Sequence, residues 1–368
     1  GCRRGVKNSL QWETHMNESL LAIAGRSIGP DEPPYCIAEV GINHNGDLGM
    51  AKRMIETAKE VGADAVKFQT FKAEEFCGDP EQMFTYQSQG KTVTESMLEM
   101  FRRYEFTPEQ WREIKVHCDT VGITFFSTPQ NRSDLDLLMS IGVPAIKVGS
   151  DDFTNLPLLR SYAAENLPLI LSCGMSDLAE VHQALETVGW FSGKPLVLLL
   201  CTSQYPTPAQ DVNVRKLTTL QQAFPGLVVG FSDHTQGPLA AALAVALGAR
   251  VFEKHFTLDH YLPGPDHWFA EDSEGLREWI QMIRGAHERL GSPMIMPTKA
   301  ERAMRLQARR SIVALRNIEM GEELNAGNIG LRRPGAGLSP ELIDRVMGLK
   351  AAHRIKKGNC LQLTDISN

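Results

Sequence analysis

Two histidines in this chain each stand at the end of a short apolar run, His234 after residues 227–233 and His255 after residues 251–254. The small, apolar residues 240–247 between the runs predict a packed helix that joins two strands. The carboxyl ends of neighbouring parallel strands lie at one edge of a sheet, so the two imidazoles are expected to meet around a divalent metal ion. A lone histidine in such a place can also serve to cap the next helix. The pair, with other polar residues at the same edge, favours the metal site.

Two lysines lie inside apolar runs, where an ammonium group is costly to bury. Each of them, Lys67 and Lys147, could extend its head to solvent if it stood alone. Two lysines at similar depth are explained better by an anion that meets them. Hydroxyl groups follow neighbouring runs at Thr128, Ser150 and Ser232. Together these residues predict a pocket for a ligand that carries a phosphate and a carboxylate group.

Further polar residues complete the predicted edge. Glu253 and His255 are two residues apart and therefore share one face of a strand. Others at the ends of apolar runs are Glu39, Gln69, Ser203 and Tyr205.

The loop 263–266 follows the second histidine run and brings another carboxylate, Asp266, to the same edge. Its glycine, Gly264, could simply supply the geometry of a turn. The adjacent His267 is a less favoured candidate for a third imidazole.

Eight short apolar runs, rich in β-branched residues, recur along the chain with helical patterns between them. This repeat predicts a (β/α)8 TIM barrel, in which the carboxyl ends of the strands surround one opening. The predicted strands are 35–40, 65–69, 123–127, 145–149, 169–172, 196–201, 227–232 and 251–255. The segment 70–106 is long and polar for a loop, and loops of this length usually cover a site or make subunit contacts.

The sequence changes character after Gly291, so we place the barrel domain at residues 17–290, a linker at 291–308 and a small module at 309–368. The module contains a repeat, because Ile318, Gly321, Leu324 and Ile329 recur 37 residues later as Ile355, Gly358, Leu361 and Ile366. The duplication predicts a pseudo-symmetric β domain. About 60 residues support only a small core, so we expect the module to dock on another surface.

The composition is that of an ordinary soluble globular protein, with 42% hydrophobic and 22% charged residues. A net charge of −6 gives no basic field for nucleic acid or an acidic membrane, and there is no long apolar run for a membrane span. The seven cysteines form no CxxC pair, which favours reduced thiols in a cytoplasmic protein. Residues 1–15 are too polar for a signal peptide, and Met16 could be the native start.

Several of these segments, in the same order along the chain, resemble the motifs of the sialic acid synthases. They include Ile37–Gly46, Gly62–Gln69, Phe231–Thr235, Glu253–Phe256 and Pro263–Asp266. The C-terminal module, with Leu331-Arg332-Arg333-Pro334-Gly335, is similar to the antifreeze-like (SAF) domain of that family, a β-clip fold. The resemblance extends from about Ile37 to Ile366.

This resemblance implies an enzyme that condenses phosphoenolpyruvate with an N-acylated mannosamine to a nine-carbon 2-keto sugar acid and releases phosphate. It also implies Mn2+ or Mg2+, and a homodimer in which the SAF domain of one subunit covers the barrel of the other. By motif, His234 and His255 would hold the metal. Phosphoenolpyruvate would be bound by Lys67, Thr128, Lys147, Ser150 and Ser232. The sugar and metal would be surrounded by Glu39, Gln69, Tyr205, Glu253 and Asp266, with Arg333 reaching the sugar from the partner subunit.

Two residues depart from the pattern of some family members. Ser203 stands where they have asparagine, so its contact with the substrate could need a bridging water. Asp152 stands where they have the longer glutamate, which leaves its role open. Neither change affects the histidines or the lysines. We expect four residues to take part in catalysis: Glu39, Lys67, Glu253 and Asp266. Glu253 is our first choice for the group that stabilises developing positive charge or deprotonates water.

The expected reaction is N-acetylneuraminate synthesis from N-acetylmannosamine. The first alternative is a legionaminic acid or related synthase that acts on 2,4-diacetamido-2,4,6-trideoxymannose, and larger or 6-phosphorylated mannosamines are others. A Schiff-base aldolase would instead use Lys67 or Lys147 without a metal. A keto-sugar-phosphate synthase is disfavoured by the C-terminal module. A carbohydrate-binding protein is a further alternative, but it would give no role to the polar residues at the barrel edge.

Overall fold

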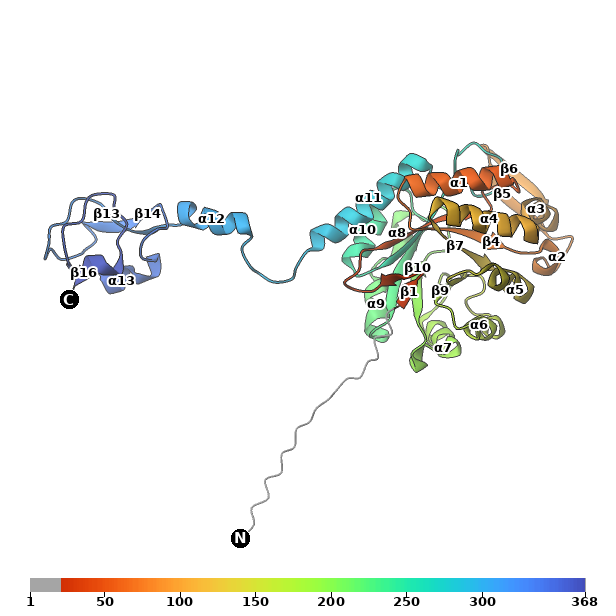
Figure 1. Cartoon of the computed structure of the whole chain (residues 1–368), viewed down its shortest axis with the longest axis horizontal. Coiled ribbons are helices and arrows are strands. Elements are labelled where there is room, and N and C mark those ends of the chain that lie inside the picture. The colour runs from red at the N-terminus through yellow and green to blue at the C-terminus, as the bar shows by residue number, and fades with distance from the viewer. Residues whose placement is uncertain (1–20, 368) are drawn as a thin grey trace, which may run out of the picture. The chain divides into compact units, whose positions relative to one another are not determined.

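The computed structural model describes residues 21–367, and the chain divides into two compact units between Gly291 and Ser292 (Figure 1). The expectations for residues 1–15 and Met16 lie outside the described part of the chain. Within residues 21–367, no helix is both long and apolar enough to cross a membrane. The six cysteines from Cys36 to Cys360 are free thiols, and all but Cys360 are buried.

Eight parallel strands form the sheet of the first unit, in the order β7-β4-β3-β12-β11-β10-β9-β8. The strands at the two ends of this order, β7 and β8, lie in contact, so the sheet closes into a barrel. The strands are β3 (Tyr35–Gly41), β4 (Ala65–Thr70), β7 (Thr124–Pro129), β8 (Ile146–Val148), β9 (Leu169–Ser172), β10 (Leu196–Cys201), β11 (Val228–Asp233) and β12 (Val251–His255). Each coincides with a predicted strand to within a few residues, which confirms the predicted barrel.

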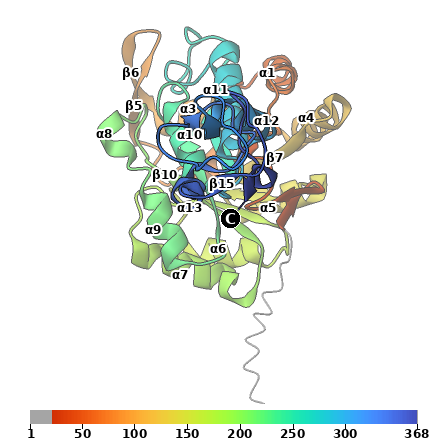
Figure 2. The same cartoon turned by 90° about the vertical axis from the view of Figure 1, so that its left-hand side faces the viewer.

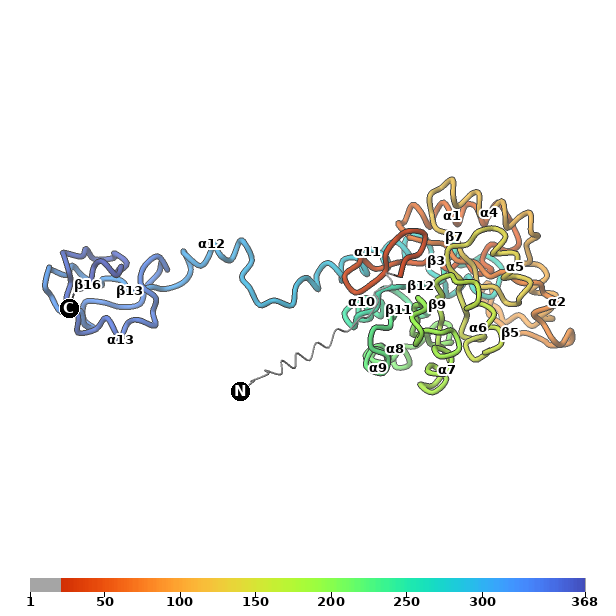
Figure 3. The backbone as a smooth tube through the Cα atoms, turned by 60° about the horizontal axis from the view of Figure 1, so that its bottom comes forward, coloured from red at the N-terminus to blue at the C-terminus, as the bar shows by residue number. Residues whose placement is uncertain are grey.

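Helices surround the strands, as Figure 3 shows. They are α1 (Leu48–Glu60), α4 (Pro108–Val121), α5 (Arg132–Ile141), α6 (Leu156–Ala163), α7 (Leu178–Val188), α8 (Ala209–Val212), α9 (Lys216–Ala223), α10 (Leu239–Ala246) and α11 (Ser273–Leu290), with a 3-10 turn at Trp190–Ser192. Their ends follow local rules. Thr107 and Gln110 form a capping box at the start of α4, and Gly122 ends that helix in the left-handed conformation. A short hairpin, β1 (Leu21–Ile23) and β2 (Arg26–Ile28), packs its apolar residues into the barrel core.

Strand β4 shows how alternation along the sequence positions polar groups. Its apolar residues include Phe68, which is buried and meets the edge of Trp111 on α4 with ring centroids 5.8 Å apart. Lys67 and Gln69 therefore point the other way, into the barrel. The same alternation in β12 directs Glu253 and His255 inward.

The segment 70–106 is built from regular elements rather than from an irregular polar loop. It contains α2 (Ala73–Phe76), the antiparallel hairpin β5 (Met83–Ser88) and β6 (Lys91–Ser96), and α3 (Met97–Tyr104). Gln89 and Gly90 both have positive φ, at 52° and 72°, as a tight two-residue hairpin turn requires. The segment has its own apolar cluster around Phe71 and Met100. Figure 2 shows the hairpin projecting from the barrel unit.

The second unit has its own apolar core, which includes Ile312, Leu324 and Leu361. Its elements are α12 (Lys299–Ala308), β13 (Ser311–Ala314), β14 (Ile329–Arg332), α13 (Ile343–Val346), β15 (Lys350–Ala351) and β16 (Ile366–Ser367), with 3-10 turns at Pro340–Leu342 and Leu363–Asp365. Helix α12 lies within the segment that the sequence suggested as a linker, and it starts at a capping box of Thr298 and Glu301.

Backbone hydrogen bonds confirm the internal repeat of this unit. Ile318 and Ile355, equivalent residues of the two copies, exchange both of their hydrogen bonds, each 2.9 Å long. Gly321 N donates to Ala351 O at 2.8 Å, and its equivalent Gly358 N donates to Ala314 O at the same distance. Each copy thus completes the other, as expected for a pseudo-symmetric β domain.

Candidate active site

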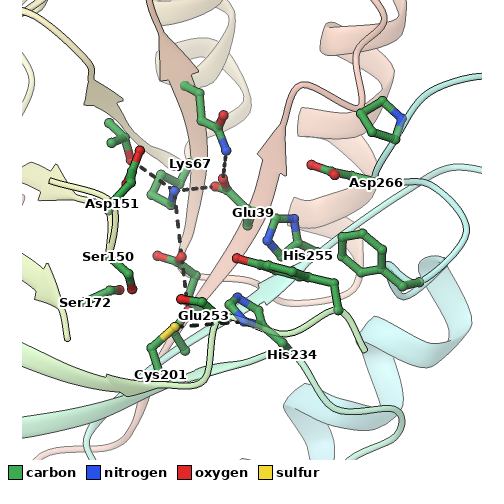
Figure 4. Close-up of a pocket in the computed structure, with 18 of the residues that line it drawn as sticks. Glu39, Lys67, Ser150, Asp151, Ser172, Cys201, His234, Glu253, His255 and Asp266 are labelled. Carbon is green, nitrogen blue, oxygen red and sulfur yellow. Dashed lines mark hydrogen bonds and ion pairs between the residues drawn. The ribbon is translucent and has the colours of Figure 1, made fainter. Parts of the chain in front are cut away.

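A cavity of about 660 Å³ opens at the carboxyl ends of the barrel strands (Figure 4). It brings together all of the predicted site residues of the barrel. These are Glu39, Lys67, Gln69, Thr128, Lys147, Ser150, Ser203, Tyr205, Ser232, His234, Glu253, His255 and Asp266. Arg333 lies in the second unit, where it is exposed at the end of β14. Asp152 does not line the cavity, whereas its neighbour Asp151 does.

Lys67 is buried between two carboxylates, as Figure 4 shows. Its Nζ lies 2.8 Å from Glu39 Oε2 and 3.7 Å from Glu253 Oε1, and it donates to Thr128 Oγ1 at 3.1 Å. Gln69 Nε2 donates to the other oxygen of Glu39 at 3.2 Å. Burial alone would lower the pKa of Lys67, but the charges of Glu253 and Glu39 raise it. The ammonium group is therefore firmly cationic.

Lys147 approaches Glu253 from another strand. Its Nζ lies 3.8 Å from Glu253 Oε2 and donates to Ser172 Oγ at 2.7 Å. Burial lowers the pKa of Lys147 despite this nearby carboxylate. Glu253 thus lies within 4 Å of two buried lysine side chains, Lys67 and Lys147, while Glu39 contacts Lys67 from its other side.

The two histidines lie side by side at the ends of β11 and β12, with ring centroids 5.4 Å apart. The ring of Tyr205 lies 4.2 Å from that of His234. His234 Nδ1 is 2.7 Å from the backbone carbonyl of Thr202, which can only accept, so Nδ1 carries a proton and Nε2 is the nitrogen left for another partner. His255 Nδ1 is buried and has no protein partner. Burial, together with His234, lowers the pKa of His255 well below its usual value.

These two imidazoles fit a divalent metal ion. A carbonyl that holds one ring nitrogen while the other is free is the usual support of a metal-binding histidine, and the orphaned nitrogen of His255 lacks any other partner. Among residues 21–367, no group of three or more His, Cys, Asp or Glu side chains is placed to hold a metal. A cation held here would therefore complete its coordination with water or substrate. His267 is not part of the cavity, because it is buried against Thr257 and Asn45.

Behind the histidines, a buried ion pair joins the two strands that carry them. Asp233 and Lys254 are register partners on β11 and β12, and Asp233 Oδ2 lies 3.3 Å from Lys254 Nζ. Asp233 also accepts a hydrogen bond from Trp279 Nε1 on α11 at 2.9 Å. Lys254 donates to the carbonyl of Thr235, directly after His234. The ion pair therefore fixes the backbone next to the first histidine.

Glu271 extends this network to the second histidine. Its Oε1 lies 3.6 Å from Lys254 Nζ and accepts from Gly237 N at 3.0 Å. Its backbone N–H donates to His255 O at 2.9 Å. Both histidines are thus tied through their backbones to one buried cluster of charges.

The cavity carboxylates have different proton affinities. Burial would raise the pKa of Glu253, but Lys147 and Lys67 lower it, so this group is ionised. Burial raises the pKa of Glu39, and Lys67 offsets the effect only in part. Asp266 lies across the cavity in Figure 4, and burial, with a contribution from Glu39, raises its pKa to about 7. Groups whose pKa values are pushed apart in this way can serve as base and acid at one pH.

Comparison with known proteins identifies the family to which this chain belongs. Residues 54–294 match the model of the NeuB family, and residues 309–367 match that of the SAF domain. The chain belongs to the NeuB family. This confirms the resemblance to sialic acid synthases that the sequence motifs indicated.

Several relatives of this NeuB-family chain are named as synthases, which confirms the expectation of a synthetic enzyme. The N,N'-diacetyllegionaminic acid synthase of Legionella pneumophila is 41% identical over 89% of this chain and 93% of its own length. Human N-acetylneuraminate-9-phosphate synthase is 34% identical over 94% of this chain and 96% of its own. A crystal structure of N-acetylneuraminic acid synthetase from Leptospira borgpetersenii matches with a TM-score of 0.69 at 31% identity, covering 77% of this chain and 94% of that one.

Some cavity residues of this NeuB-family chain were not among the predicted site residues. Gln130 follows β7 directly, two residues beyond Thr128, and alternation along the strand could have identified it. Aromatic side chains of the segment 70–106 also line the cavity, namely Phe76, Phe84, Tyr86 and Phe101. The sequence predicts a loop for the segment 70–106, and a loop has no periodicity from which the direction of these aromatic side chains could be inferred. They show that this segment forms part of the cavity wall.

Proposed function

We propose that this chain condenses phosphoenolpyruvate with an open-chain N-acylated amino hexose to give a nine-carbon 2-keto acid and phosphate. The observation that carries the proposal is the position of ionised Glu253 between Lys67 and Lys147, in the same cavity as the histidine pair. Two buried ammonium groups suit a multiply charged anion, and the histidines suit a cation beside it. The named relatives support the same chemistry.

Phosphoenolpyruvate is assigned to the deep end of the cavity. Lys67 and Lys147 offset its charge, and the hydroxyls of Thr128, Ser150 and Ser232 donate hydrogen bonds to its oxygens. These groups come from the ends of four different strands, so the fold rather than one loop defines the anion pocket.

The reaction forms one carbon–carbon bond, consumes one water and moves three protons. The methylene carbon of phosphoenolpyruvate attacks the aldehyde carbon of the sugar, and the aldehyde oxygen takes a proton. Water adds to the phosphate-bearing carbon and loses one proton. When the bond between this carbon and the phosphate oxygen breaks, the new hydroxyl group gives its proton to the departing phosphate and becomes the ketone oxygen. Glu253 is placed to take the proton from water and to stabilise positive charge, since it is ionised. Asp266, whose pKa is raised to about 7, is placed to protonate the aldehyde oxygen.

His234 and His255 are the residues that would hold the divalent metal, with manganese or magnesium the candidates. When bound, the cation supplies Lewis acidity to the sugar carbonyl. The ring of Tyr205 lies against both imidazole rings, and that of Phe269 lies against the ring of His255.

The sugar is proposed to be uncharged, with 2,4-diacetamido-2,4,6-trideoxymannose ahead of N-acetylmannosamine. The sequence motifs alone favoured N-acetylmannosamine, and the order changes because the relative at 41% identity is a diacetyllegionaminic acid synthase. Among residues 21–367, Lys67 and Lys147 are the only lysines or arginines that line the cavity, and both are assigned to phosphoenolpyruvate. A 6-phosphorylated sugar would find no further cation in this barrel.

We also propose a homodimer in which the second unit of one chain covers the barrel of its partner, with Arg333 reaching the sugar. Residues from Ser292 onward carry thirteen lysines and arginines against seven aspartates and glutamates, although the whole chain has a net charge of −6. The barrel part is therefore strongly acidic, and opposite charges favour docking. Small-molecule substrates and a second copy of the chain are the only partners proposed, without nucleic acid or membrane. Buried free thiols support a cytoplasmic location.

The decisive assay measures phosphate released from phosphoenolpyruvate with each of the two sugars and Mn2+. Chelation should abolish turnover and Mn2+ should restore it. One observation favours a Schiff-base aldolase, because Lys147 has a lowered pKa. That alternative predicts borohydride trapping of pyruvate on a lysine and activity without metal, so the two assays together separate the reactions.

A further inference from the structure

We propose that Gln130 and the aromatic residues Phe84 and Phe101 form a subsite that selects a sugar with a second acetamido group, at carbon 4. The inference rests on the proposed function and identifies the residues that would distinguish the two candidate sugars. It follows from an apolar wall, from one unpaired hydrogen-bond acceptor and from their place relative to the histidines.

The wall consists of four aromatic side chains of the segment 70–106: Phe76, Phe84, Tyr86 and Phe101. Phe76 and Phe101 meet edge to face with ring centroids 4.9 Å apart, and Phe84 stacks on Tyr86 at 5.7 Å. Tyr86 donates its hydroxyl to Glu95 at 2.6 Å, which leaves its ring rather than its polar end for a ligand. All four are only partly buried although they line the cavity. The wall therefore offers apolar surface that a ligand could cover.

Gln130 supplies a polar group beside this wall. Its backbone N–H donates to Thr70 O at 3.1 Å, which places it at the root of the segment 70–106. Ser133, three residues later, donates to Glu75 on α2 at 2.5 Å and holds the two regions together. The Oε1 atom of Gln130 is buried and has no protein partner, although the residue lines the cavity. A buried amide oxygen of this kind is normally paired, so a donor on the ligand is expected.

The strand order places Gln130, which follows β7, three strands around the barrel from His255 on β12. Strand β7 is separated from β12, which carries His255, by β4 and β3, and neighbouring strands are about 4.8 Å apart. Gln130 is also two residues beyond Thr128 of the anion pocket and therefore lies nearer the mouth. A six-carbon sugar whose aldehyde lies at the histidines extends over phosphoenolpyruvate toward Gln130 and the aromatic wall.

An acetamido group matches both features of the subsite. Its N–H can donate to Gln130 Oε1, and its methyl group can cover an aromatic face. A hydroxyl group at the same carbon could donate but would bring no methyl group. A phosphate group would place charge against aromatic rings and an amide oxygen, with no cation to offset it. The arrangement therefore favours a neutral sugar with an acetamido group at carbon 4.

The test compares kcat/KM for 2,4-diacetamido-2,4,6-trideoxymannose and for N-acetylmannosamine in the Gln130→Met variant. Methionine keeps the length of glutamine but removes the acceptor, so kcat/KM for the diacetamido sugar should fall by about 10- to 100-fold. The value for N-acetylmannosamine should change by less than about threefold. Gln87→Leu is the matched control, because Gln87 also lines the cavity but its amide is already bonded to Thr92 at 2.9 Å.

The Phe84→Leu variant tests the wall independently and does not disturb the amide. It should reduce the preference for the diacetamido sugar by several-fold and leave the KM of phosphoenolpyruvate unchanged. If Gln130→Met reduced kcat/KM equally for both sugars, the inference would be overturned, because Gln130 would then recognise the acetamido group that the two sugars share. If the wild-type chain released no phosphate with either sugar, the proposed function itself would fail, and the variants would not be needed to show it.

Discussion

Lys147 and Glu253 approach to 3.8 Å at the deep end of the cavity, yet the ammonium group gives its hydrogen bonds elsewhere. Lys147 Nζ donates to Ser172 Oγ at 2.7 Å and to Val148 O at 3.0 Å. An ammonium group has three donors, so one remains for a ligand. The pairing with Glu253 is thus electrostatic, and an incoming anion can bind without displacing a hydrogen bond from the carboxylate.

Replacing Lys147 with alanine should therefore weaken phosphoenolpyruvate far more than the sugar. Charge-assisted hydrogen bonds are worth roughly 1.5–3 kcal/mol, which corresponds to about one to two decades in affinity. Steady-state kinetics should show this rise in the KM of phosphoenolpyruvate with little change for the sugar. Lys194→Ala is a suitable control, since Lys194 is partly buried but bonds only to Ala163 O. A rise confined to the KM of the sugar would mean that the two substrates are assigned to the wrong ends of the cavity.

Lys254→Met tests the support of the histidines, because it leaves Asp233 as an unpaired charge in the core. Loss of one partner of a buried ion pair usually costs about 3–5 kcal/mol of stability. Loss of such outer support typically weakens metal binding about 10- to 100-fold. Thermal unfolding followed by circular dichroism, and Mn2+ titration followed by electron paramagnetic resonance, would measure the two effects separately.

Lys52→Met is the matched control for that variant, because Lys52 pairs with Glu113 at the protein surface. Surface pairs contribute little, so neither stability nor Mn2+ affinity should change appreciably. A Lys254→Met protein that is folded and binds Mn2+ as tightly as the wild type would show that the ion pair does not position the histidines.

Much of the barrel could be predicted because its strands are short apolar runs at regular intervals. The inward direction of Lys67 and Gln69 followed from their spacing of two, and the structure places both in the cavity. The meeting of His234 and His255 followed from their equivalent places on neighbouring strands. The alternation of side chains along a strand is enough to predict such positions, because the tertiary fold adds only the closure of the sheet into a barrel.

Other parts of the site could not be predicted, because they depend on contacts between distant segments. In the sequence, Asp233 and Lys254 are charged residues next to the histidines, with no sign that they pair. Their ion pair becomes evident only when β11 and β12 are aligned in register. The segment 70–106 has a polar composition, which hides the alternation of Phe84 and Tyr86 in a hairpin. Helix α12 was missed because a proline-containing stretch precedes it, although Thr298 and Glu301 form a capping box.

The activity should depend on pH through Asp266. Its pKa is raised to about 7, so the group is protonated below that pH and loses its proton above it. If Asp266 protonates the aldehyde oxygen, kcat/KM for the sugar should fall as the pH rises through about 7. The Asp266→Asn variant should be slower and should lack this descending limb. A wild-type profile that is flat from pH 6 to 8 would exclude Asp266 as the acid.

The last prediction concerns the sharing of one site between two chains. Arg333 is exposed at the end of β14 in the second unit, while every other predicted site residue lies in the barrel. A small, basic module gains stability by docking on an acidic surface. We therefore expect each active site to take its histidines and lysines from one chain and Arg333 from the other. The alternative is that Arg333 is a solvated surface residue.

Mixed dimers distinguish these possibilities. His234→Ala and Arg333→Ala chains should each be nearly inactive alone. When they are unfolded and reassembled together, sharing in trans gives one site with both lesions and one site with neither, so mixed dimers should regain up to about half of the wild-type activity per dimer. His234→Ala mixed with Lys147→Ala is the control, because both lesions lie in the barrel and each site of that dimer keeps one of them. Differently tagged chains would verify that mixed dimers have formed. If verified mixed dimers of the first pair stayed inactive, Arg333 would serve its own chain or no site at all.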